Sequence, residues 1–189
     1  GYQNNAAFSS NALVPIYDSI YTWTWDTIIN NWTSHPTGKI CNILYDNHQN
    51  PISYINQSWN GNSWINSGRT DIIYNVNNKM LSVTSQIWNG SAWSNTDRNI
   101  TSYDSHDNPT LFTIQQWNGT SWDNNLQISY SYDSHNNCTL QLSQVWSGGM
   151  WSNTSQQLFV FDSNDNEISS TIQNMNGTSW QNSNQYIYT

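Results

Sequence analysis

Residues 103–132 read YDSHDNPTLFTIQQWNGTSWDNNLQISYSY, and this stretch decides the fold. Asn118-Gly119 lies between two runs of β-favouring residues, and Asn-Gly is the strongest short-range signal for a β-hairpin. We expect a first strand over 110–117, a loop over 118–121 and a second strand over 122–132. The stretch therefore predicts an antiparallel hairpin with a tryptophan at each side of its loop.

The same pattern recurs along the chain with a period of 29 residues. Nine of the 12 tryptophans occupy repeat positions, so the repeat and not chance composition places them. The aromatic columns are Tyr45, Tyr74, Tyr103, Tyr132 and Phe161; Trp59, Trp88, Trp117, Trp146 and Met175; and Trp64, Trp93, Trp122, Trp151 and Trp180. The amide columns are Gln57, Gln86, Gln115, Gln144 and Gln173, and Asn66, Asn95, Asn124, Asn153 and Asn182.

The spacing also predicts which side chains share a face of the sheet. A four-residue loop places Trp117 opposite Trp122, and residues opposite each other across antiparallel strands point to the same side. A two-residue turn would shift the pairing but leave both tryptophans on one face. A five-residue turn over 133–137 carries that face into the next unit. Steps of two along the second strand then predict that the core face also carries Leu126, Ile128, Tyr130 and Tyr132.

The repeats predict an all-β fold with about ten antiparallel strands in a curled meander sheet. A flat sheet of that width would leave its tryptophans in water. We therefore expect a curled or closed sheet, a barrel, a flattened sandwich or a shell, with the aromatic residues inside; packing on another copy is the other way to cover them. The alternative is a β-solenoid with one 29-residue coil per repeat, in which the Asn and Gln columns would stack as ladders.

Three regions follow from the repeat. Residues 45–189 form five hairpin repeats in one continuous domain, and residues 17–44 read as a degenerate capping repeat. Residues 1–16 read as an N-terminal arm that can donate a strand to the free sheet edge of a neighbour. The tryptophans outside the repeat columns are Trp23, Trp25 and Trp32.

Composition excludes several classes of partner. Only 8% of the residues are charged and the net charge is −8, so no basic stripe exists to neutralise phosphates. We expect neither nucleic acid nor an anionic membrane as a partner, and no apolar run approaches the roughly 18 residues that span a bilayer. Cys41 and Cys138 lack metal-site spacing and read as two small buried thiols, with one disulfide as the alternative.

The repeat resembles a known class of secreted bacterial repeats. Tyr103-Asp104, followed by a turn and Asn108, resembles tandem YD-type repeats, and the Gln-x-Trp-Asn-Gly-x-x-Trp-x-Asn of residues 115–124 is similar to repeats of type 9-secreted surface proteins of Bacteroidota. Rhs and teneurin YD shells are more distantly similar. The resemblance covers residues 45–189, and this chain departs from the pattern at Asn75, Phe161 and Met175.

That resemblance implies an extracellular or cell-surface location in a bacterium and an architectural or adhesive role. It also implies O-glycosylation, because Asp18-Ser19-Ile20 and Asp26-Thr27-Ile28 match the acceptor pattern of Bacteroidota. The candidate acceptors are therefore Ser19 and Thr27.

The residues that could suggest metal binding or catalysis are more simply explained by the turns of the repeat. His48, His106 and His135 share one repeat column, but neighbouring copies are predicted about 9.6 Å apart, so we interpret them as polar turn residues. Residues 162–167 alternate oxygen side chains like part of a Ca²⁺ loop, yet lack its glycine and its distal glutamate. Glu167 is the only glutamate, and no Gly-x-Ser-x-Gly motif exists. We predict no catalytic residue, metal or cofactor, and no enzyme.

Two functions remain. The first is a non-enzymatic extracellular structural protein, a subunit or segment of a surface fibre or adhesin that self-associates through the ends of its sheet. The alternative is a carbohydrate-binding surface module, because sugar rings stack on exposed indoles; paired tryptophans that stack on each other across the strands are the competing explanation. The residues that would bind surface glycans are Trp59, Trp64, Trp88, Trp93, Trp117, Trp122, Trp146, Trp151 and Trp180.

Overall fold

The computed structural model describes residues 16–189, and every regular element in this part of the chain is a β-strand. None of the described residues forms a helix that is long and apolar enough to cross a membrane. The chain divides into two units, Gly1–Ser67 and Gly68–Thr189. The predicted strand-donating arm, 1–16, lies outside the described residues except for Ile16.

The first unit starts with short strands and ends with a regular hairpin. Tyr21 on the first strand pairs antiparallel with Lys39, and Trp25 pairs with Trp32 in a separate two-stranded sheet. The strands are β1 (Ser19–Thr22), β2 (Trp25–Asp26), β3 (Asn31–Trp32), β4 (Gly38–Tyr45) and β5 (Pro51–Trp59), followed by the beginning of β6 (Trp64–Tyr74).

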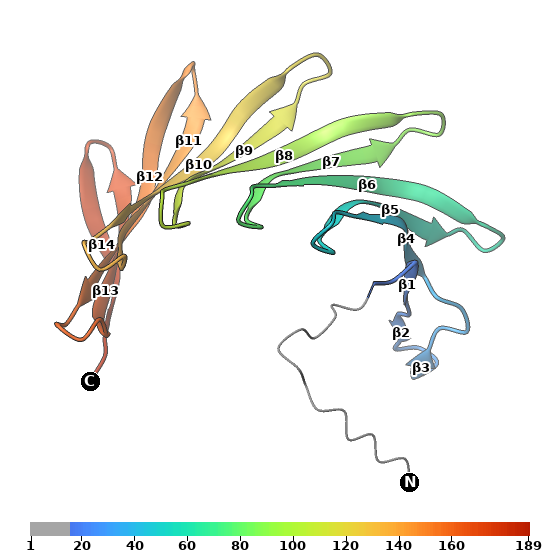
Figure 1. The fold of residues 1–189 in the computed structure, drawn as a ribbon, viewed down its shortest axis with the longest axis horizontal. Coiled ribbons are helices and arrows are strands. Elements are labelled where there is room, and N and C mark those ends of the chain that lie inside the picture. The colour runs from blue at the N-terminus through green and yellow to red at the C-terminus, as the bar shows by residue number, and fades with distance from the viewer. Residues whose placement is uncertain (1–15) are drawn as a thin grey trace, which may run out of the picture. The chain divides into compact units, whose positions relative to one another are not determined.

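The second unit contains the rest of β6 and four further hairpins. Figure 1 shows β7 to β14 in chain order, with the glycine-containing loops at one end and the Tyr-Asp turns at the other. The strands are β7 (Met80–Trp88), β8 (Trp93–Tyr103), β9 (Pro109–Trp117), β10 (Trp122–Tyr132), β11 (Cys138–Ser147), β12 (Met150–Phe161), β13 (Glu167–Asn176) and β14 (Ser179–Ile187).

The sheet is an open antiparallel meander, which confirms the predicted all-β hairpin repeat. Apart from β2 and β3, the described strands follow one linear order from β1 to β14, and each is hydrogen-bonded to its neighbours in that order. A solenoid would place parallel strands 29 residues apart side by side, so that alternative is wrong. The expected closure is also wrong, since the order has two ends.

The register within the hairpins agrees with the spacing argument. Trp117 lies opposite Trp122, and Gln115 lies opposite Asn124. The Oδ1 atom of Asn118 accepts the backbone N–H groups at positions 120 and 121, which holds the four-residue loop. The loop at Gly148-Gly149 has only two residues, both with positive φ, and such a turn suits the twist of a hairpin.

One prediction about the faces is wrong, and a β-bulge is the reason. Gln115 pairs with Asn124, but its neighbour Ile114 pairs with Leu126, so Asn125 is an extra residue in β10. An extra residue reverses the alternation of side chains along the strand. The face opposite the Trp122 ring therefore carries Leu126, Ile128, Tyr130 and Tyr132.

A second bulge in each repeat restores the alternation. Ser131 pairs with Leu140 and Tyr132 with Cys138, which makes Thr139 an extra residue at the start of β11. Two reversals in each repeat cancel, so the tryptophan pairs of successive hairpins lie on one side. We call this side, with its tryptophan pairs and Gln–Asn pairs, the tryptophan face.

Deep burial is rare in this sheet. Among the described residues only Cys41 (6% exposed) and Ser170 (1%) are buried, and most strand residues are half-buried. Cys41 and Cys138 are both free thiols, and Cys138 is half-buried. Side chains are therefore covered mainly by their cross-strand neighbours, which explains how an uncovered tryptophan face is tolerated.

Candidate functional site

The tryptophans of the repeats pair with each other across each hairpin. Their rings meet at steep interplanar angles of 61° to 67°, an edge-to-face arrangement that aromatic pairs favour. Trp180 lies opposite Met175 instead of a second indole. All nine residues are half-buried. The ring pairs, with centroid distances of 5.0 to 5.4 Å, are Trp59–Trp64, Trp88–Trp93, Trp117–Trp122 and Trp146–Trp151.

Each ring pair is followed by an amide pair on the same face. In the third repeat Gln115 Nε2 donates to Asn124 Oδ1 at 2.7 Å, and both residues lie two positions from a tryptophan. The other repeats contain the same bond at 2.7 to 2.9 Å, between Gln57 and Asn66, Gln86 and Asn95, Gln144 and Asn153, and Gln173 and Asn182. The predicted Gln and Asn columns are therefore cross-strand partners inside a hairpin.

A further column joins one hairpin to the next, and sequence reasoning missed it. Arg98 Nε donates to Gln115 Oε1 at 2.6 Å, and the guanidinium carbon lies 4.8 Å from the centroid of the Trp122 ring. Gln127 makes the same kind of bond to Gln144, also at 2.6 Å. The signal was present as a further column with the 29-residue period. We call the column the connectors: Arg69, Arg98, Gln127, Gln156 and Gln185. The junction bond is made by Arg98, Gln127 and Gln156, whereas Arg69 bonds to Asp71 on its own strand.

The Tyr-Asp turns are held by their aspartates. Asp104 Oδ1 accepts the backbone N–H groups of His106 and Asn108, at 2.8 and 2.9 Å. The Asn108 backbone N–H is the main group that lowers the pKa of Asp104, with His106 contributing and partial desolvation opposing. Asp162 accepts equivalent bonds from 164 and 166, so its loop is a turn of the same type as the other repeats.

Neighbouring turns touch through their side chains, although adjacent copies of the histidine column were predicted about 9.6 Å apart. Asn77 Nδ2 donates to Asp107 Oδ1 at 2.9 Å, and His135 Nδ1 lies 3.0 Å from Asp165 Oδ1. The backbone N–H of each of the column histidines, His48 among them, donates to the aspartate of its own turn. Within residues 16–189 no three His, Cys, Asp or Glu side chains gather as metal ligands would.

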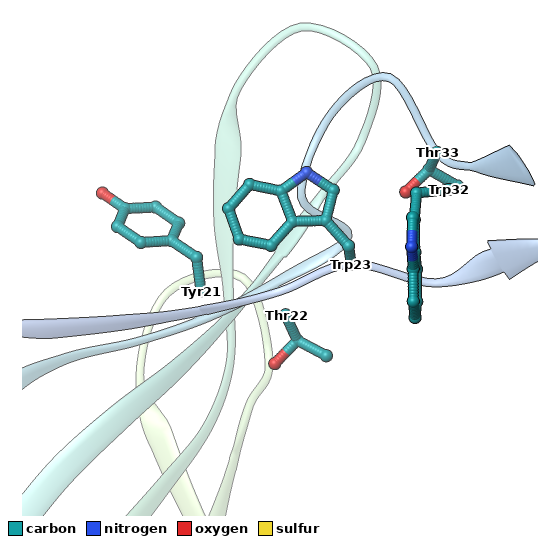
Figure 2. Close-up of a pocket in the computed structure, with 5 residues that line it drawn as sticks. All are labelled: Tyr21, Thr22, Trp23, Trp32 and Thr33. Atoms are coloured by element: carbon teal, nitrogen blue, oxygen red, sulfur yellow. The ribbon is translucent and has the colours of Figure 1, made fainter. Parts of the chain in front are cut away.

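One hollow lies in the first unit, among residues that do not follow the repeat. Its volume is about 570 Å³. Figure 2 shows Trp23 between Tyr21 and Trp32. Tyr21 is 45% exposed, Trp23 46% and Trp32 57%. The lining residues are Tyr21, Thr22, Trp23, Trp32 and Thr33.

A second hollow of about 160 Å³ also uses the Tyr21 ring, with His35, Pro36, Trp59 and Trp64. Of the predicted glycan-binding residues, Trp59 and Trp64 therefore lie beside these hollows. Sequence reasoning set the tryptophans at 23 and 32 aside as out of phase. Their clustering within ten residues was a sequence signal for the first hollow.

The two candidate glycosylation positions differ in accessibility. Thr27 is exposed in the turn between β2 and β3, whereas Ser19 is half-buried on β1. Accessibility therefore favours Thr27 as the acceptor, and modification of either residue remains a prediction.

Comparison with known proteins adds support for the fold. No protein-family model and no curated protein matches the chain. A Bacteroides fragilis protein of unknown function has a similar structure, with a TM-score of 0.52 at 15% identity over 65% of this chain and 92% of that one. DUF3836 family proteins of Bacteroides vulgatus and Parabacteroides distasonis match with TM-scores of 0.34 and 0.29, at 25% and 15% identity. They cover 44% and 62% of this chain, and 90% and 91% of their own chains.

Proposed function

We propose that this chain is a non-enzymatic structural segment of an extracellular bacterial fibre or adhesin, whose copies associate through the ends of the sheet. The free edge of β14 is the observation that carries this proposal. β14 is last in the strand order, and β13 is its only strand partner among the described residues. Its other side therefore presents backbone groups that a further strand can pair with.

The edge of β14 lacks the usual protection against strand addition. Exposed edge strands of monomeric proteins commonly carry charged residues or proline. Residues 179–187 read SWQNSNQYI, with neither. Tyr186 and Ile187 are 47% and 70% exposed near the end of the strand. Such an edge favours pairing with another strand over remaining in water.

The connector column indicates what kind of strand fits. Gln156 on β12 donates to Gln173 on β13, and Gln185 occupies the same repeat position on β14. An added antiparallel strand that follows a Tyr-Asp turn would recreate this junction. β1 lies at the other end of the strand order, so β1 of a second copy is the candidate for the added strand. Its residues, SIYT, contain no glutamine, so it would pair through backbone groups and not through the connector bond. Head-to-tail addition of this kind generates an open filament.

The extracellular location is supported by the resemblance of residues 45–189 to secreted YD-type repeats and by a surface solvated by amides rather than charges. Strand donation by residues 1–16 stays a prediction. We assign no catalytic residue, because a residue that recurs in the repeats is more simply explained by the fold than by one active site.

The test compares two identical substitutions at connector positions. Gln185→Glu removes the amide donor and adds a negative charge at the free edge, while Gln156→Glu makes the same change inside the sheet. We expect sedimentation and electron microscopy to show assemblies for the parent chain and the Gln156→Glu variant, and dispersed protein for Gln185→Glu. Equal assembly of all three chains, or of none, contradicts association through β14.

Carbohydrate binding is the second candidate function. The observation that favours it is the pair of aromatic hollows in the first unit, where Trp23 and Trp32 are 46% and 57% exposed. The repeat tryptophans are weaker candidates, because most of their rings are engaged with a partner ring.

A further inference from the structure

The two hollows of the first unit share one aromatic ring. Tyr21 lines both, with its centroid 6.4 Å from that of Trp23 and 6.0 Å from that of Trp64. Trp32 lines the first hollow and Trp59 the second. The hollows therefore form one row of five aromatic side chains, which we call the aromatic groove.

The rings of the aromatic groove are held in place by neighbouring residues and are not merely exposed. The Trp25 ring supports Trp32 at a centroid distance of 5.3 Å and an interplanar angle of 88°. The turn between them is fixed by Asp26, whose Oδ1 accepts the backbone N–H of Ile28 at 2.8 Å. Holding large apolar rings in water is unfavourable, so a supported and exposed ring is better explained by a ligand than by packing.

The lining of the first hollow is neutral and amphipathic, which limits the ligand class. It contains no charged side chain, and its polar groups are three hydroxyls, of Tyr21, Thr22 and Thr33, and two indole N–H groups. A positive charge, the Lys39 ammonium, lies 5.5 Å from the Tyr21 ring centroid. The Thr33 hydroxyl donates to the His35 carbonyl, whereas the Thr22 hydroxyl bonds to none of the described residues. A pyranose ring has apolar C–H faces and a hydroxyl rim that match such a lining. The net charge of −8 disfavours acidic sugars.

The tilt of the rings distinguishes a single chain from a flat surface. Tyr21 is inclined by 51° to Trp23 and by 61° to Trp64. Rings that stack on a crystalline polysaccharide must be nearly coplanar, whereas tilted rings can each face a different sugar of one flexible chain. The geometry therefore fits a soluble oligosaccharide.

We propose that the aromatic groove binds a neutral oligosaccharide, with Tyr21, Trp23 and Trp32 stacking on its sugar rings. This inference rests on the second candidate function, carbohydrate binding, and is independent of association through β14. It also places the stacking residues outside the repeats, while the repeat tryptophans Trp59 and Trp64 line only the second hollow.

The experiment is calorimetric titration of the full chain with soluble cellohexaose, xylohexaose, mannohexaose, maltohexaose and laminarihexaose. We expect at least one to bind and to change the tryptophan fluorescence. Trp23→Ala and Trp32→Ala should each weaken that binding about tenfold or more. Trp23→Phe should weaken it less, and it serves as a second variant if the alanine substitutions disturb folding. Tyr186→Ala, which removes an exposed aromatic ring outside the groove, is the control and should leave the affinity within about twofold, while Trp180→Ala tests the repeat tryptophans.

The other outcomes show whether the groove, the function or the ligand class is wrong. If none of the five sugars binds, both the groove and the carbohydrate-binding function are wrong. If binding is lost in Trp180→Ala but kept in Trp23→Ala, sugar binding stands and the groove is wrong. Tighter binding of hexagalacturonate or choline than of the neutral sugars overturns the ligand class.

Discussion

The periodic hairpins and the aperiodic start of the first unit differ in how far their tryptophans are exposed. In the second unit the ring pairs lie 5.0 to 5.1 Å apart and are half-buried on long strands. In the first 40 residues of the first unit, Trp23, Trp25 and Trp32 are 44% to 57% exposed and lie on or beside strands of two to four residues. In the periodic part the indoles are half-buried in cross-strand ring pairs, whereas in the aperiodic part Trp23 has no indole partner among the described residues and the paired Trp25 and Trp32 remain exposed.

This difference shows how a repeat can separate framework from function. A residue that recurs in every hairpin is constrained by pairing on both sides, so it has little freedom to face a ligand. Residues that fall outside the period lack that constraint. The following substitutions test whether the division is real.

The largest expected effect comes from removing one member of a repeat pair. Trp117→Ala deletes a half-buried ring and its contact with Trp122, and we expect a loss of about 2 kcal/mol or more in the free energy of unfolding. Trp23→Ala removes an exposed ring, and the loss should be below about 0.5 kcal/mol. Urea denaturation measures both. Equal losses would remove the distinction between the two regions.

Glycine substitutions should lower stability more in the loops of the repeats than in the first unit. Gly119 has φ +102°, which side chains rarely adopt, so Gly119→Ala should cost about 1 to 2 kcal/mol. At Gly38 a new Cβ would make ordinary contact with Thr22 at 3.6 Å, and Gly38→Ala should change stability by less than about 0.5 kcal/mol. Thermal unfolding of the two variants gives the comparison, and a larger loss for Gly38→Ala would count against it.

The smallest effect concerns the Tyr-Asp turns and appears only in acid. Because the folded-state pKa of Asp104 is lowered, its ionised form stabilises the fold above the ordinary aspartate pKa of 3.8, and this contribution is lost as the pH falls through the lowered value. Asn75 makes equivalent bonds to the N–H groups of Asn77 and Lys79, both at 2.9 Å, without a charge.

Asp104→Asn should therefore leave the melting temperature at neutral pH nearly unchanged and reduce its fall in acid. Melting curves between about pH 6 and about pH 2.5 measure this difference. A variant that melts far lower at neutral pH would show that the charge, and not the bonding geometry, holds the turn.

Much of the hairpin architecture was predictable from the sequence, because it depends on local signals. The 29-residue period, the loops at Asn118-Gly119 and its counterparts, and the pairing of Trp117 with Trp122 all follow from turn chemistry and strand parity. The five-residue turns were predictable for the same reason, since their aspartates recur with the period.

The faces and the closure were not predictable, because they depend on bulges and on packing across hairpins. Nothing in residues 122–132 marks Asn125 as the extra residue, yet that single position moves Tyr130 to the other side of the sheet. Closure was expected in order to bury the tryptophans. Ring pairing, the amide pairs and the Arg98 contact cover part of their surface without it.

The candidate groove was missed for a related reason. The signals that predicted the hairpins recur with the 29-residue period, whereas the tryptophans at positions 23 and 32 lie outside that period. Their juxtaposition with Tyr21 depends on the separate β2–β3 pair and on the pairing of β1 with β4, which skips both of those strands. Connections of that kind leave no local signature in the sequence.

The most direct test of the central claim, that the open sheet joins copies through its last strand, is amide hydrogen exchange measured across protein concentration. We predict that the amides of β14 become protected as concentration rises, while those of β10, already paired on both sides, exchange at a constant slow rate. Exchange of β14 that does not depend on concentration, in samples that nevertheless assemble, would contradict the account.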